Sequence, residues 1–275
     1  TAVAAPGTQG QWQLPNGQQC MKWTQIASEG GLLPSPIIRD NFELWPAKRR
    51  EFVLDFTRYM DGTPTTPGDV IYLVNTMFMP NGRKPVFPGE PDFGAPQPGG
   101  VTAATYKVPM MKIEIMGDPP EPDLSVMPTK NTKLRPLAAL PNNARLAALP
   151  HRTFTLQRGG TAGGETEWLI NGLEFNPTLP MALTTKGRPE VWTVANGGGG
   201  WVHPMHMHME EHRVLSRTST RPHPDDVGRE DVVALDPSES VTFYRNFRTF
   251  LGKYVAHCHN LAHEDHNMMF GWEIR

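Results

Sequence analysis

At 275 residues the chain is long enough for one large or two modest domains, and it has no apolar stretch long enough to span a bilayer. Its formal net charge is −2 and no basic run is apparent, which argues against a nucleic-acid partner. Glycine and proline contribute 26 and 28 residues, and no extended apolar helical pattern occurs, which disfavours a helical fold.

Short strand-like runs separated by turn residues predict an all-β sandwich. In the first half, residues 51–59 (EFVLDFTRY) place Phe52, Leu54 and Phe56 on one face of an expected strand. Residues 118–150 are rich in proline, leucine and asparagine, which is typical of a linker. The other expected strands are residues 70–75, 107–116, 152–158, 167–175, 190–197, 212–218, 239–247 and 253–259.

Two short segments concentrate side chains that bind metal ions. These side chains are His203, His206 and His208 in the first segment, and His257, Cys258, His259, His263 and Met268 in the second. A thiolate, two imidazoles and a weak thioether make up the ligand set of a mononuclear blue-copper site. That site does not use the remaining four histidines, which therefore indicate a second metal site nearby.

Cys258 lies in a predicted strand between two histidines, and alternation along the strand assigns them to different faces. The thiol of Cys258 points to one face, whereas the imidazoles of His257 and His259 point to the other. An electron that arrives at the thiolate therefore has a path of a few covalent bonds into a second site.

The same rule sorts the upstream segment. His203 differs from His206 and His208 by an odd number of residues, so an extended chain turns it away from that pair. A turn after residue 259 can fold the end of the motif back over the cysteine. The first predicted site therefore consists of His203, Cys258, His263 and, at longer range, Met268. The second consists of His206, His208, His257 and His259.

Zinc is the main alternative metal. A tetrahedral zinc site uses a similar cysteine and histidine inventory, and strand histidines often only form hydrogen bonds. Zinc needs neither a thioether at a fixed offset nor histidines that face away from the cysteine. The joint pattern of the two segments therefore favours copper.

The two segments, with the tail HCHNLAHEDHNMM, resemble the third and fourth copper signatures of the multicopper oxidases, especially the bacterial laccase and bilirubin oxidase branch. The resemblance implies cupredoxin-like Greek-key sandwiches and one-electron oxidation of a donor coupled to four-electron reduction of dioxygen to water. It implies these ligands: His203, Cys258, His263 and Met268 for type 1 copper, His206 for type 2 copper, and His208, His257 and His259 for the type 3 pair. It also implies that Glu264 delivers protons, although a solvated or ligand-orienting carboxylate is the other interpretation.

The resemblance covers nearly the whole chain but leaves the trinuclear cluster incomplete. The sequence has 10 histidines and no His-x-His pair before residue 203, so it supplies only half of the implied cluster ligands. We therefore expect an N-terminal partner chain, or the other product of a cleaved precursor, to supply the missing pairs. On this view residues 1–117 are part of a middle domain, residues 118–150 are a linker and residues 151–275 are a complete C-terminal domain.

Three other classes of copper protein remain open. A freestanding type 1 electron carrier leaves the four surplus histidines without a purpose. A copper nitrite reductase resembles the chain less, because its cysteine is not flanked by histidine on both sides. A non-catalytic copper-binding subunit is the third class. Copper chemistry favours an oxidising compartment, so we expect a periplasmic or secreted protein, with Cys20 free or bonded to the partner.

The electron donor is predicted only by class. A phenolic or aromatic molecule is expected to dock at an exposed edge of His203 or His263. The alternative is a metal-ion donor at a cluster of methionines that interleave with the first histidines and of carboxylates that follow them, for which core packing is the plainer interpretation. This cluster consists of Met205, Met207, Met209, Glu210, Glu211 and His212.

Overall fold

A computed structural model describes residues 19–86, 101–160, 164, 166–197, 199–219 and 221–275. These residues form two compact units. The first contains residues 19–24, 38–41, 53–86 and 101–128, and the second contains residues 25–37 and 42–52 together with the described part of 129–275. Within the described ranges, the helices are all too short or too polar to cross a membrane.

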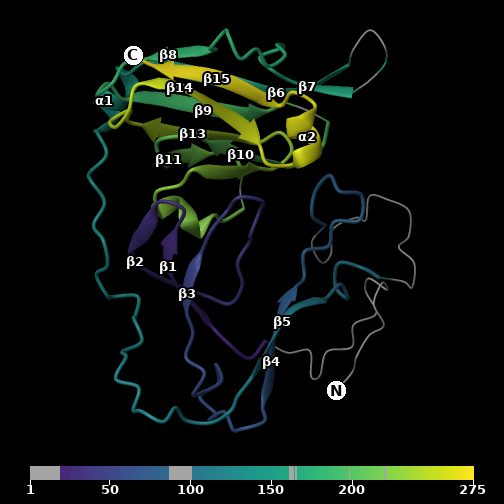
Figure 1. Ribbon diagram of the computed structural model, residues 1–275, viewed down its shortest axis with the longest axis vertical. Coiled ribbons are helices and arrows are strands. Elements are labelled where there is room, and N and C mark those ends of the chain that lie inside the picture. The colour runs from purple at the N-terminus through teal and green to yellow at the C-terminus, as the bar shows by residue number, and fades with distance from the viewer. Residues whose placement is uncertain (1–18, 87–100, 161–163, 165, 198, 220) are drawn as a thin grey trace. The chain divides into compact units, whose positions relative to one another are not determined.

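The second unit is built on two five-stranded sheets stacked as layers (Figure 1). One sheet has the order β12 (Val232–Leu235), β10 (His203–Met207), β14 (Gly252–Cys258), β15 (Met269–Ile274), β8 (Ala182–Thr184). The other has the order β11 (His212–Arg217), β13 (Ser240–Arg245), β9 (Glu190–Asn196), β6 (His151–Gly160), β7 (Thr166–Ile170). Neighbouring strands are antiparallel except for the pairs β15–β8 and β6–β9. The predicted all-β fold is confirmed.

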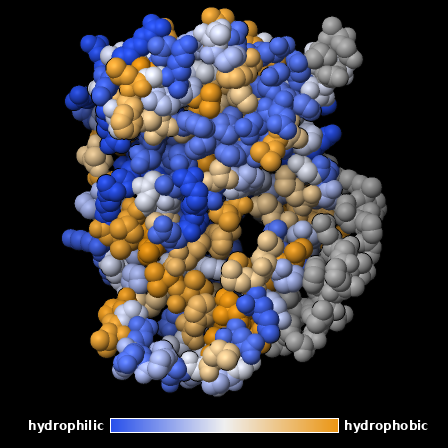
Figure 2. Space-filling view, in the orientation of Figure 1, coloured by the Kyte–Doolittle hydropathy of each residue, from blue (hydrophilic) through white to orange (hydrophobic). Residues whose placement is uncertain are grey.

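The hydrophobic core of this sandwich lies between the two sheets. Strands β13 and β15 each alternate buried and partly buried residues, which is the pattern of a strand with one face on a core. Trp192 and Phe243 from one sheet meet Phe270 and Trp272 from the other, and all four are fully buried. The outer surface of the sandwich seen in Figure 2 is largely hydrophilic, with scattered apolar side chains.

The remaining elements are short. The strands β1 (Trp23–Ser28), β2 (Gly31–Arg39) and β3 (Glu51–Val53) form a sheet of order β2-β1-β3, and β4 (Val70–Asn75) pairs with β5 (Val108–Glu114) in the first unit. The helices are α1 (Asn143–Ala147), the 3-10 turn η2 (Pro224–Val227) and α2 (Leu261–Asp265). Helix α2 matters most for the site, because it follows β14 directly.

Two predicted strands end at least five residues earlier than expected. The strand predicted at 51–59 ends at Val53, and the Asp55 carboxylate then accepts a hydrogen bond from the Thr57 N–H, which closes a turn. The strand predicted at 167–175 ends at Ile170, because Asn171 and Gly172 adopt the left-handed backbone of a turn, with φ of 54° and 73°. Strands β1, β2, β8, β12 and β15 were not predicted.

Candidate metal centre

The candidate centre lies on β10 and β14, two adjacent strands inside one sheet of the sandwich. Their antiparallel register sets Met205 opposite Cys258 and His206 opposite His257. Residues directly opposite each other in an antiparallel pair share a face, so this register brings the two sequence segments together in two separate groups.

The first group contains one thiol and two imidazoles. The Sγ atom of Cys258 lies 3.7 Å from Nδ1 of His203 and 3.8 Å from Nδ1 of His263. The two Nδ1 atoms are 3.1 Å apart. His203 begins β10, Cys258 ends β14 and His263 lies in α2, so three elements converge on one point.

Burial controls the protonation of this group. Burial, with a smaller contribution from His263, lowers the pKa of His203 to about 3. Burial and the neighbouring His266 lower the pKa of His263 to about 4. Burial raises the pKa of the Cys258 thiol to about 12. At neutral pH the imidazoles therefore offer lone pairs, whereas the thiol needs a cation to replace its proton.

Met268 is fully buried in the same core cluster as Cys258. The backbone N–H of Cys258 donates to the carbonyl of Met268 at 3.0 Å, and the N–H of Met268 donates to the carbonyl of His263 at 2.9 Å. The loop after β14 therefore folds back against its own strand, as the predicted turn requires.

The expectation that His203 or His263 presents an exposed edge is wrong. His203 is 0% exposed and His263 is 3% exposed. Two indoles cover these rings: Trp168 of β7 lies 4.1 Å from the ring centre of His263 and 5.0 Å from that of His203, and Trp201 lies 5.0 Å from that of His263. No sequence pattern indicates this cover, because Trp168 belongs to the opposite sheet.

The second group contains four imidazoles. Their ring centres lie between 4.6 Å and 5.6 Å apart in five contacting pairs drawn from His206, His208, His257 and His259. The Nε2 atoms of His208 and His257 face each other at 3.1 Å. Burial and the neighbouring imidazoles lower the pKa of His208 to about 4 and also lower the pKa of His259. Imidazole rings this close together can share a metal ion.

Glu264 lies beside the second group, although it follows His263 directly in the chain. Its Oε1 atom is 3.3 Å from Nδ1 of His257, and its carboxylate can join His257 and His259 around one ion. Helix α2 therefore directs one residue to each group. The structure brings together the residues that alternation assigned to each site, and their metal-binding roles stay predictions.

Most side chains of the alternative metal-ion cluster, which spans residues 205–212, have other contacts in the structure. Met205 and Met207 are buried in the hydrophobic core. The Glu210 carboxylate accepts hydrogen bonds from the backbone N–H groups of Arg248 and Thr249. His212 is buried against the ring of Phe243. The two methionines and His212 therefore pack in the interior, and Glu210 holds the loop at residues 248–249.

Sequence reasoning missed two residues next to the histidines. Arg245 is fully buried, its guanidinium lies over the rings of Trp192 and Trp272, and its Nη2 atom donates to the carbonyls of His208 and Glu210. Asp231 lies against His206. Burial raises the pKa of Asp231, but hydrogen bonds with His206 and Arg49 outweigh it and the net shift is downward. Neither residue belongs to a recognisable motif.

Comparison with known proteins identifies relatives of the chain. Residues 145–275 match the family model described as "Multicopper oxidase". The chain is 32% identical over 252 residues to a bilirubin oxidase from Albifimbria verrucaria, covering 89% of the chain and 38% of that protein. It is 28% identical over 281 residues to a laccase from Bacillus subtilis (strain 168), covering 91% of the chain and 46% of that protein.

Solved structures share the fold. The crystal structure of a laccase from Pediococcus acidilactici superposes with a TM-score of 0.64 at 22% identity, covering 92% of this chain and 45% of that one. The sheets therefore match cupredoxin-like domains. The chain spans less than half the length of each of these three proteins.

Proposed function

The chain belongs to the multicopper oxidase family through its residues 145–275, and we propose that it supplies the type 1 copper site and half of the trinuclear copper ligands of an oxidase. Such an enzyme takes four electrons, one at a time, from a donor and passes them with four protons to dioxygen, forming two waters. The observation that carries the proposal is the pair of ligand groups on the two faces of β14, one at Cys258 and one at His257 and His259.

The residues present fit copper. The first group combines a thiol with two neutral imidazoles, buried together with a methionine, which is the donor set of a blue-copper site. The Nδ1 atoms of His203 and His263 both face Sγ of Cys258, so their lone pairs converge on one point. The second group offers imidazoles alone, which suit copper ions that bind dioxygen. In our assignment the first group holds type 1 copper, His206 holds type 2, and His208, His257 and His259 hold the type 3 pair.

Copper, when bound, supplies the one-electron chemistry. The chain links the two ligand groups through its backbone, shields the first group from water and holds a proton beside the second. Cys258 is joined to His257 and His259 by a few covalent bonds, so its backbone links the two ligand groups. The carboxylate of Glu264, 3.3 Å from Nδ1 of His257, is placed to hold a proton beside the second group. Trp168 keeps water away from the imidazoles of the first group.

The other cluster ligands come, in this proposal, from an N-terminal chain or segment with two His-x-His pairs. The relatives are about twice as long as this chain or longer, which supports that expectation. We retain the division into a partial middle domain at 1–117, a linker at 118–150 and a C-terminal domain at 151–275 as part of the proposal. An oxidising location, periplasmic or secreted, is also part of it.

A phenolic or aromatic molecule is the proposed donor class, since relatives carry the names laccase and bilirubin oxidase. The burial of His203 and His263 requires electrons to cross the side chains that cover them. The packing of Met205 and Met207 in the core argues against a metal-ion donor at that cluster.

Native mass spectrometry of the protein purified from its source tests the proposal, together with electron paramagnetic resonance and oxygen uptake. We expect type 1, type 2 and type 3 copper, a companion polypeptide with two His-x-His pairs, and donor-dependent oxygen uptake. Type 1 copper alone, with no companion and no oxygen uptake, would leave an electron-transfer protein instead. The Cys258→Ser variant is the control, because it should lose the blue absorption while the companion stays bound.

A further inference from the structure

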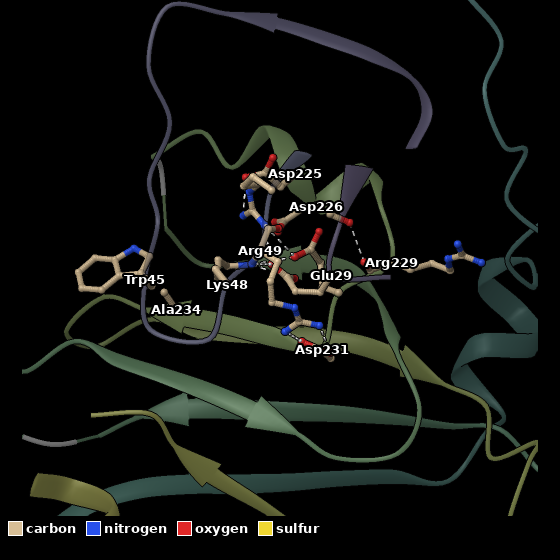
Figure 3. A network of polar contacts seen from close by, with 12 residues as sticks. Glu29, Trp45, Lys48, Arg49, Asp225, Asp226, Arg229, Asp231 and Ala234 are labelled. Carbon is tan, nitrogen blue, oxygen red and sulfur yellow. Dashed lines mark hydrogen bonds and ion pairs between the residues drawn. The ribbon is translucent and has the colours of Figure 1, made fainter. Parts of the chain in front are cut away.

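Three consecutive basic residues, Lys48, Arg49 and Arg50, lie in the segment 42–52 of the second unit. Each forms an ion pair with a different acid near residue 230 (Figure 3). Lys48 Nζ lies 2.8 Å from Glu230, and Arg50 Nη2 lies 2.8 Å from Asp225. Both side chains are nearly buried, with 8% and 2% exposed. They fix the backbone on either side of Arg49.

Arg49 binds Asp231 through two parallel hydrogen bonds. Its Nη1 atom donates to Oδ1 at 2.9 Å and its Nη2 atom donates to Oδ2 at 2.6 Å. Figure 3 shows the guanidinium end-on to the carboxylate. A bidentate pair of this kind fixes the orientation of the carboxylate as well as its position.

Asp231 in turn contacts His206. It directly precedes β12, in which Val232 pairs with His206 of β10. The carbonyl oxygen of Asp231 accepts the N–H of Met207 at 2.8 Å and lies 3.1 Å from Nδ1 of His206. Its Oδ1 atom lies 3.6 Å from the same nitrogen. The carbonyl and carboxylate oxygens of Asp231 that face Nδ1 of His206 can only accept a hydrogen bond, so this geometry favours the tautomer with its hydrogen on Nδ1.

We propose that Arg49 and Asp231 are positioning residues for His206, which hold its ring in the Nδ1–H tautomer with Nε2 free for a metal ion. Segment 42–52 then forms part of the metal centre, although it lies more than 150 residues away in sequence. Partners of this kind orient metal-binding histidines and raise their basicity. The proposal rests on the proposed function only in taking the ion to be copper.

The competing explanation is that the pair merely fastens the segment 42–52 to the sandwich. The variant Arg49→Gln removes the bidentate pair while Lys48 and Arg50 keep the segment in place. Arg49→Lys keeps the charge with a single donor group. Arg152→Gln is the matched control, because Arg152 binds Glu190 through two hydrogen bonds of 2.7 Å and 3.0 Å in the same unit and contacts none of the four histidines.

The first measurement is the ¹⁵N–¹H correlation spectrum of the histidine rings in the metal-free chain. In the wild type and in Arg152→Gln we expect His206 as the Nδ1–H tautomer. In Arg49→Gln and in Asp231→Asn we expect a mixture of both tautomers, and Arg49→Lys should restore part of the wild-type signal. A merely structural pair would leave the tautomer of His206 unchanged.

The second measurement is titration with copper(II), followed by electron paramagnetic resonance of copper bound to imidazole nitrogen. Arg49→Gln should weaken binding at the four histidines by about tenfold, the lower end of such effects, and leave type 1 loading unchanged. The double variant Arg49→Gln/Asp231→Asn should be no weaker than either single variant, because both remove one interaction. Full additivity, or an equal loss in Arg152→Gln, overturns the proposal.

The two proposals fail separately. If the wild-type protein together with its companion chain binds no copper at the four histidines, the proposed function fails there. The tautomer of His206 in the metal-free chain still decides the role of Arg49. If copper binds but the tautomer is the same in Arg49→Gln as in the wild type, the positioning role fails and the proposed function stands.

Discussion

Loading the Cys258 site with a divalent metal should release about one proton, and this number follows from the burial of its ligands. The thiol, with its pKa raised to about 12, is protonated throughout the neutral range and must lose its proton. The imidazoles of His203 and His263, with pKa values lowered to about 3 and about 4, are already neutral and release none. With ordinary pKa values near 6.5, the two rings would release about 1.5 further protons at about pH 6.

Cobalt(II) is a suitable probe, because it takes a similar ligand set and does not oxidise a thiolate. A Cys20→Ser background leaves Cys258 as the sole cysteine, so the thiolate-to-metal absorption band reports on this site alone. The logarithm of the apparent binding constant should rise with a slope of about 1 between about pH 5.5 and about pH 8. A slope near 2.5 at about pH 6 would refute the reasoning that burial keeps the imidazoles neutral. Cys258→Ser, which should show no band, is the control.

Three further predictions concern single side chains. Cys258→Ser should abolish the blue band and turnover together, whereas Cys20→Ser should keep both. Met268→Leu should keep the blue colour and raise the reduction potential, because it removes a weak axial donor; voltammetry that shows an unchanged potential would argue against axial ligation. Burial holds the pKa of His212 well below its ordinary value, so only the unfolded state binds its proton as pH falls through about 6.5. The free energy of unfolding should therefore fall by about 2 kcal/mol between about pH 8 and about pH 5 because of His212. In urea unfolding experiments, the His212→Leu variant should lose that much less stability over the same pH range.

The two ligand groups were predictable because side-chain alternation is a local property of a strand. Once residues 253–259 form a strand, Cys258 and its neighbours must face opposite ways, whatever surrounds them. Strands β4 and β9 were also predictable from a local signal, because their β-branched and aromatic residues favour extended backbone. Strand β15 is harder to predict, because it begins directly after Met268, inside the metal motif.

The surroundings of the groups were not predictable, because they depend on pairing between distant parts of the chain. Arg49 and Asp231 are 182 residues apart and meet only after β12 takes its place beside β10. Three basic residues in a row, Lys48 to Arg50, do not by themselves indicate which acids they will meet. The burial of His263 depends on Trp168, which reaches it across the sandwich.

The discontinuous second unit also has a consequence for synthesis. Lys48 and Arg50 are made long before Glu230 and Asp225, so at about 5–20 residues per second they wait on the order of 10–40 seconds for their partners. During that interval segment 42–52 has no counter-charges from the C-terminal region. A gene fragment cut at the linker would remove the segment altogether and leave Glu230 without the cation of Lys48. The ion pairs that join segment 42–52 to the C-terminal region can therefore form only after residue 231 has left the ribosome.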